Sequence, residues 1–169
     1  MKRIKWFIQA LVPALGVALL SQTAGALERG QSQGGISYVS GGIGLEEQAV
    51  LHAERSRYSL WVATVAKGSG AYLSDARLRV TNLDGNRVVL EVTVDGPWVF
   101  AALPPGRYEV SATLRAESAD AAETITRIVR IQLGDHRQAV LRFASSADVA
   151  PEGEHPFNGN PFGGALPAR

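Results

Sequence analysis

Three histidines are the residues of this chain best suited to binding a metal or moving a proton: His52, His136 and His155. None has a partner at metal-ligand spacing, and no His-Glu-x-x-His segment occurs. His52 falls in a predicted helix, His136 in a predicted turn and His155 in a tail rich in Pro and Gly. We therefore expect no metal, no cofactor and no catalytic histidine.

The remaining candidates for catalysis are equally isolated. Glu46 and Glu47 are adjacent, and neighbours on a helix do not face each other, so a solvated first turn is the better interpretation. Ser37, Ser40 and Ser59 lack the strand-to-helix context of a catalytic serine, and no Gly-rich loop opens a helix for a nucleotide phosphate. The sequence predicts a protein that is not an enzyme.

Two tryptophans could bind a sugar by stacking on its ring. Trp61 and Trp98 both stand in apolar runs, which favours burial in the core over exposure in a binding site. A carbohydrate- or peptidoglycan-binding module is thus the alternative function, and it requires at least one exposed tryptophan.

The strands and turns that would position a functional site are most clearly predicted in residues 95–110. Asp95-Gly96 predicts a tight turn, and Pro97 allows a strand to begin only at or beyond it. Residues 98–103 are apolar at every position, as in a strand covered on both faces, and residues 107–115 alternate as in a half-buried strand.

This hairpin resembles that of carboxypeptidase regulatory-like domains and their transthyretin-like and Cna-B-like relatives. The resemblance covers about residues 58–143 and implies a seven-stranded antiparallel β-sandwich of the transthyretin (prealbumin-like) type. It implies no crosslink, because Lys67, the only lysine after the first five residues, lies in a Gly-rich loop. The residues that carry the hairpin signature, all with expected structural roles, are Trp98, Phe100, Leu103, Pro104, Pro105, Gly106 and Tyr108. Tyr108 is expected to cap a nearby backbone group with its hydroxyl.

The segments around the sandwich differ in composition. Residues 27–44 are rich in Gly, Ser and Gln and predict a flexible leader, in which a short strand near residues 36–39 stays open. Residues 45–57 predict a helix, with Leu45, Ala49 and Ala53 recurring every four residues, packed over one end of the sandwich.

The tail is expected to be disordered from residue 144 to residue 169, because Pro and Gly are dense there. It contains a tandem Pro-Phe repeat whose aromatic side chains, Phe157 and Phe162, are candidate contacts for a partner protein.

Residues 1–26 have the pattern of a Sec-type signal peptide: a basic start, an apolar stretch and an Ala-x-Ala cleavage site ending at Ala26. A membrane anchor is the alternative interpretation. Removing Lys2, Arg3 and Lys5 from the 17 cations leaves 14 against 16 acids, a formal charge of −2, which gives no case for nucleic acid binding. With no cysteine, the chain cannot form disulfides.

These patterns together predict an exported single-domain all-β protein, periplasmic or secreted, with no membrane span after cleavage. We expect it to bind a protein partner, or to serve as a structural accessory, in the cell envelope.

Overall fold

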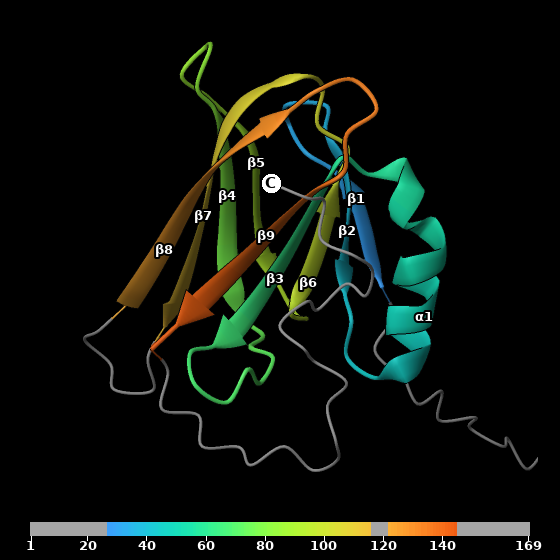
Figure 1. Cartoon of the computed structure of the whole chain (residues 1–169), viewed down its shortest axis with the longest axis vertical. Coiled ribbons are helices and arrows are strands. Elements are labelled where there is room, and N and C mark those ends of the chain that lie inside the picture. The colour runs from blue at the N-terminus through green and yellow to red at the C-terminus, as the bar shows by residue number, and fades with distance from the viewer. Residues whose placement is uncertain (1–26, 116–121, 145–169) are drawn as a thin grey trace, which may run out of the picture.

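Two β-sheets face each other in the computed structural model, which describes residues 27–115 and 122–144. The five-stranded sheet has the order β1-β2-β6-β3-β9 and the four-stranded sheet the order β5-β4-β7-β8 (Figure 1). In this part of the chain the protein is an all-β sandwich with one short α-helix. The elements are β1 (Glu28–Gln31), β2 (Ser37–Gly41), α1 (Leu45–Glu54), the 3-10 turn Arg55–Arg57, β3 (Leu60–Ala66), β4 (Ala76–Asn82), β5 (Arg87–Val94), β6 (Trp98–Ala101), β7 (Gly106–Arg115), β8 (Ala122–Ile131) and β9 (Arg137–Phe143).

The main core lies between the two sheets. On β4, Leu78 and Val80 point inward and are buried, whereas Arg77 and Arg79 alternate with them and are exposed. Such alternation is expected of an antiparallel sheet with one face on a core and the other in water.

β3 and β6 are buried at every position because the five-stranded sheet is covered on both faces. Its outer face carries a second cluster, in which Leu51 of α1 packs with aromatic residues of β3 and β6. The helix thus lies on a sheet face and not over one end of the sandwich, as the sequence had suggested (Figure 1). α1 is the only α-helix in the described residues. No helix in this part of the chain is long and apolar enough to span a membrane.

The prediction of a flexible leader at residues 27–44 is wrong for this structure. β1 and β2 form an antiparallel pair there, and β2 pairs with β6 from Tyr38 to Gly41. Val39 is fully buried in the outer cluster, so this strand contributes to the core although its neighbours are Ser and Gly. These two strands raise the count in the described residues from the expected seven to nine.

The sheets are also not wholly antiparallel. β3 and β9 run parallel along seven residue pairs, from Leu60 beside Arg137 to Ala66 beside Phe143. The antiparallel prediction therefore fails at this pair, because the chain returns from β8 to β9 by crossing between the sheets. Outside the named strands, Val65 and Tyr72 form an isolated antiparallel bridge in the described residues.

The hairpin expected at residues 95–110 is wrong. β6 belongs to the five-stranded sheet and β7 to the four-stranded sheet, so the turn from Pro104 to Gly106 carries the chain from one sheet to the other, although the local contacts of this segment are as expected. Gly96 lies so close to the Gly41 backbone that a Cβ there would sit 2.3 Å from the Gly41 carbonyl oxygen. The Tyr108 hydroxyl donates a hydrogen bond to the Pro104 carbonyl at 2.9 Å, which confirms the expected backbone cap. The signature residues Trp98, Phe100, Leu103 and Tyr108 are buried, whereas the two prolines of the turn are exposed.

Candidate binding surfaces

The two described histidines contact aromatic rings. His52 meets Trp98 edge to face at 5.3 Å between ring centroids, and His136 stacks on Trp61 at 5.4 Å. The His136 Nδ1 lies 2.8 Å from the Tyr58 carbonyl oxygen. In the described residues no group of three or more His, Asp or Glu side chains could hold a metal. His155 lies outside those residues.

Partial burial, with the nearby Arg55 as the second cause, lowers the pKa of His52 below its ordinary value. The helix therefore packs most stably with this imidazole neutral. His52 and His136 both act here as parts of the packing between α1, the turn before β9 and the outer cluster.

Glu47 caps the backbone of the loop before α1. The expectation that both adjacent acids are solvated is therefore wrong for Glu47. Its carboxylate accepts hydrogen bonds from the amides of Gly42 at 2.8 Å and Ile43 at 3.0 Å. The Gln48 side-chain amide donates to the Gly42 carbonyl at 3.0 Å, which fixes the same loop from the other side. Glu46 is exposed.

Both tryptophans are buried, as their apolar context predicts: Trp61 is 7% exposed and Trp98 is 1% exposed. The Trp61 indole donates to the carbonyls of Arg55 and Tyr58 at 3.1 and 3.0 Å. Neither ring is available for stacking on a sugar, so the carbohydrate alternative loses the feature that suggested it.

The first candidate surface runs along β8. In the described residues β7 is the only strand that pairs with β8, so the opposite edge of this ten-residue strand carries unpaired backbone groups. β9 of the other sheet lies close to β8 but does not pair with it. The other edge of the same sheet is contacted at one residue: the Ser32 hydroxyl donates to the Val89 carbonyl of β5, and Gly34 packs against Val89. The bare edge at β8 is therefore a distinctive feature of the four-stranded sheet.

Exposed side chains of two kinds accompany this edge. Ile128 is 71% exposed and Leu133, just beyond the strand, is 92% exposed. Arg127 and Arg130 are exposed as well, and Arg127 makes no ion pair with a described residue. We call the bare edge of β8 together with Arg127, Ile128, Arg130 and Leu133 the edge surface.

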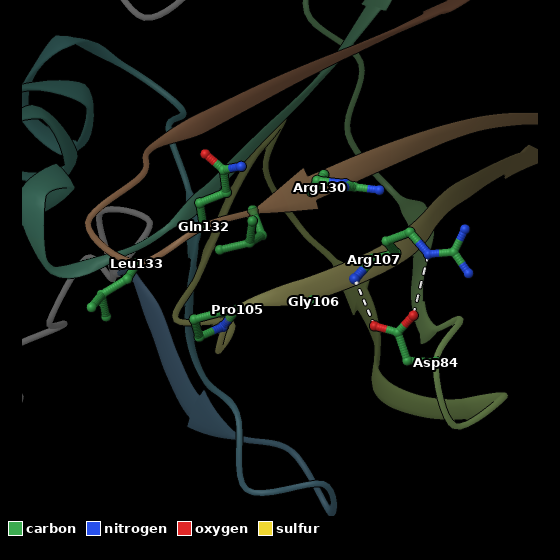
Figure 2. A pocket seen from close by; sticks show the side chains of 8 residues that line it. Asp84, Pro105, Gly106, Arg107, Arg130, Gln132 and Leu133 are labelled. Carbon is green, nitrogen blue, oxygen red and sulfur yellow. Dashed lines mark hydrogen bonds and ion pairs between the residues drawn. The ribbon is translucent and has the colours of Figure 1, made fainter.

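A shallow hollow of about 490 Å³ continues the edge surface where β7 begins and β8 ends (Figure 2). Arg107 and Arg130 are directly opposite each other on the two strands and both line it. Asp84, from the turn between β4 and β5, accepts hydrogen bonds from the Arg107 amide at 3.1 Å and from its Nε at 3.2 Å. These bonds, the one from the amide foremost, lower the pKa of Asp84. Two arginines against one carboxylate leave the hollow net positive.

The second candidate surface is the outward side of α1 and the loop before it. It consists of Ile43, Leu45, Ala49, Val50 and Ala53, which are all exposed. Leu45 is 84% exposed and Ile43 is 57% exposed, although the loop that displays them is fixed by Glu47 and Gln48. We call these five residues the helix surface.

The helix surface contains the four-residue repeat that the sequence analysis assigned to packing. Leu51, outside that repeat, is the one fully buried residue of α1. The sequence thus identified the apolar stripe but placed it on the wrong side of the helix. The edge surface was not singled out in the sequence, although Ile128 breaks the alternation of residues 122–131 and could have indicated it.

Phe157 and Phe162, the contacts predicted in the tail, lie outside the described residues. Comparison of the chain with models of protein families, with curated proteins and with solved structures found no match.

Proposed function

We propose that this protein is an exported, non-catalytic binding domain of the cell envelope, periplasmic or secreted, and that its edge surface takes an extended, acidic segment of a partner protein. The observation that carries the proposal is the unpaired β8 edge with exposed Ile128, at the opposite side of the sheet from β5, where Ser32 contacts Val89.

An exposed strand edge binds a partner strand through its backbone. The unpaired amides and carbonyls of β8 offer main-chain hydrogen bonds to an added strand, and side chains at alternate positions select its sequence. Ile128 offers apolar contact on the outer face of that strand, and Leu133 offers it beside the hollow. A segment pairing with β8 would reach the hollow at the end of the strand and could insert a side chain there.

The charged side chains of β8 determine which partner segments the edge surface attracts. Arg127 and Arg130 project from β8, and Glu123 is the single acid on the strand. The Glu123 carboxylate already accepts a hydrogen bond from the Ala144 amide at 2.8 Å. Acidic side chains on the partner would therefore be attracted to the arginines, and basic ones repelled.

Export and family are parts of the same proposal. β1 begins at Glu28, two residues after the expected cleavage site, and Leu27 packs against the outer cluster. A chain cleaved after Ala26 would thus keep every described residue of the fold. The two-sheet architecture, and the turn after Phe100 that the Tyr108 hydroxyl caps, support the assignment to the carboxypeptidase regulatory-like group and its transthyretin-like topology.

Binding of a defined peptide tests the edge surface directly. The probe is a ten-residue peptide of alternating Glu and Val, and its control is the same peptide with Lys in place of Glu. Titrated into the isotope-labelled chain, the acidic peptide is expected to shift backbone amide resonances along β8 and around the hollow. The basic peptide is expected to bind at least about tenfold more weakly.

Paired variants locate the interaction. Replacing both Arg127 and Arg130 with Glu is expected to reverse the preference between the two peptides. The matched control replaces Arg77 and Arg79 with Glu, because these arginines are exposed on β4 of the same sheet but away from its edge. Shifts that spread over β5, or a preference that the control variant reverses equally well, would contradict the proposal.

A photo-crosslinking residue at position 128 tests the function in cells. A single reproducible partner containing an acidic extended segment is expected, captured at position 128 and not at position 91, which is exposed on β5 at the opposite side of the sheet. Capture that is equal at both positions, or that is unaffected by Arg127→Glu with Arg130→Glu, would count against the edge surface.

A further inference from the structure

The helix surface is a second, separate apolar patch that the proposed function does not use. The described residues include five large apolar side chains with high exposure, and three of them, Ile43, Leu45 and Val50, belong to this patch. Exposed apolar side chains that cluster in this way mark interaction sites more often than scattered ones do.

The loop and helix hold these side chains in fixed positions. Gly42 and Gly44 have φ angles of 94° and 87°, which other residues rarely adopt. Gly42 also contacts the Trp98 ring, where a Cβ would lie 3.0 Å from Cγ. Together with the bonds from Glu47 and Gln48, this geometry prevents Ile43 from turning inward. A preformed apolar surface loses little conformational freedom on binding.

The outward side of α1 is self-complementary. Ala49 and Ala53 lie one turn apart along its middle, and small side chains there allow another helix to approach closely. Glu46 is exposed at the N-terminal end of this side, and Arg57 is exposed just beyond the C-terminal end. When two copies of the helix pack antiparallel about a two-fold axis, Ala49 of each lies beside Ala53 of the other. Glu46 of each copy then lies near Arg57 of the other.

We propose that two copies of this chain associate through their helix surfaces, with the α1 helices antiparallel about a two-fold axis. The partner is a second copy because both the apolar stripe and the opposite charges at its ends are complementary to themselves, which is what a two-fold interface requires. A ten-residue helix is about 15 Å long, so the contact belongs with small interfaces that bury less than about 1,200 Å² in total. The dimer is therefore weak and depends on concentration.

Reversing one charge at a time distinguishes this dimer from a nonspecific apolar association, which would not depend on Glu46 and Arg57. Sedimentation equilibrium of the full exported chain measures the dimer over a range of concentrations. Glu46→Arg alone, and Arg57→Glu alone, each place like charges at both ends of the interface. Each is expected to weaken the dimer about tenfold, because two attractive contacts become two repulsive ones. The double variant restores opposite charges and is expected to recover the original association.

Two further variants make the outcome specific. Ala53→Glu places a charge in the middle of the stripe and is expected to abolish the dimer. Glu91→Arg makes the same charge change as Glu46→Arg but lies on β5 of the other sheet, and it is expected to leave the dimer unchanged. Circular dichroism and thermal melting of each variant establish that the fold is intact.

A wild-type chain that is monomeric at every concentration would overturn the proposal. A dimer that persists in both single reversals would overturn it too, as would a dimer lost in both singles and not recovered in the double variant. Peptide binding at the edge surface is measured separately on β8, so failure of the dimer and failure of the proposed function are distinguishable.

Discussion

Replacing Leu51 with Ala tests which side of α1 packs on the sheet. Leu51 is fully buried and contacts the aromatic outer cluster. The substitution removes three carbon atoms, about 2.4 kcal/mol at about 0.8 kcal/mol for each, and the cavity left behind raises the cost to about 3 kcal/mol. At about 4 °C for each kcal/mol in a domain of this size, the melting temperature is expected to fall by about 12 °C.

Leu45→Ala is the matched control, because it makes the same chemical change on the same helix at a residue that is 84% exposed. It is expected to change stability by less than about 0.5 kcal/mol. Urea unfolding, followed by tryptophan fluorescence at a concentration where the chain is monomeric, measures both variants. If the two variants lose equal stability, or Leu45→Ala loses more, the assignment of the packed face is wrong.

Three further outcomes are expected. Tyr108→Phe removes the hydrogen bond to the Pro104 carbonyl and should cost about 1 kcal/mol in urea unfolding; an unchanged midpoint would refute the role of the cap. The lowered pKa of His52 means that stability held above pH 6.5 is lost as pH falls through the folded value. His52→Gln should therefore flatten the stability profile between pH 7 and pH 5, and an unaltered slope would contradict this. Deleting residues 150–169, which removes Phe157 and Phe162, should weaken partner capture in cells, and unchanged capture would eliminate the tail as a contact.

The sequence predicted the sandwich well where hydrophobic alternation was strong. The strands expected at residues 98–103 and 107–115 occur as β6 (Trp98–Ala101) and β7 (Gly106–Arg115), with ends shifted by one or two residues. Leu78 and Val80 point inward, and residues 98–101 are covered on both faces as their apolar run predicted. The turn residues from Pro104 to Gly106 also separate the strands as expected, since their backbone preferences are local.

Long-range pairing could not be predicted in the same way. β2 is short and contains Ser and Gly, so its own composition indicates a loop, and only pairing with β1 and β6 makes it a strand. The helix was misplaced for a related reason. Its periodic stripe is real, but the face that packs is chosen by Leu51 together with the fixed loop around Gly42, which the sequence pattern does not show.

The candidate surfaces depend on what the fold leaves uncovered, which a single sequence does not show. Nothing in residues 122–131 indicates that their outer edge stays bare while the turn at Ser32 contacts the opposite edge. Catalytic residue spacing indicates neither surface, because one is defined by unpaired backbone and exposed side chains and the other by exposed apolar side chains.

The parallel pair of β3 and β9 has a consequence for the order in which the chain can fold. Leu60 pairs with Arg137, so 77 further residues must be synthesised before β9, the second neighbour of β3, is present. At a synthesis rate of about 5–20 residues per second, this delay is about 4–15 s. During that time one side of a strand that is apolar except for Thr64 has no permanent neighbour. Contacts of such high sequence separation also slow folding itself, so the nascent chain offers a long interval in which a chaperone could bind β3.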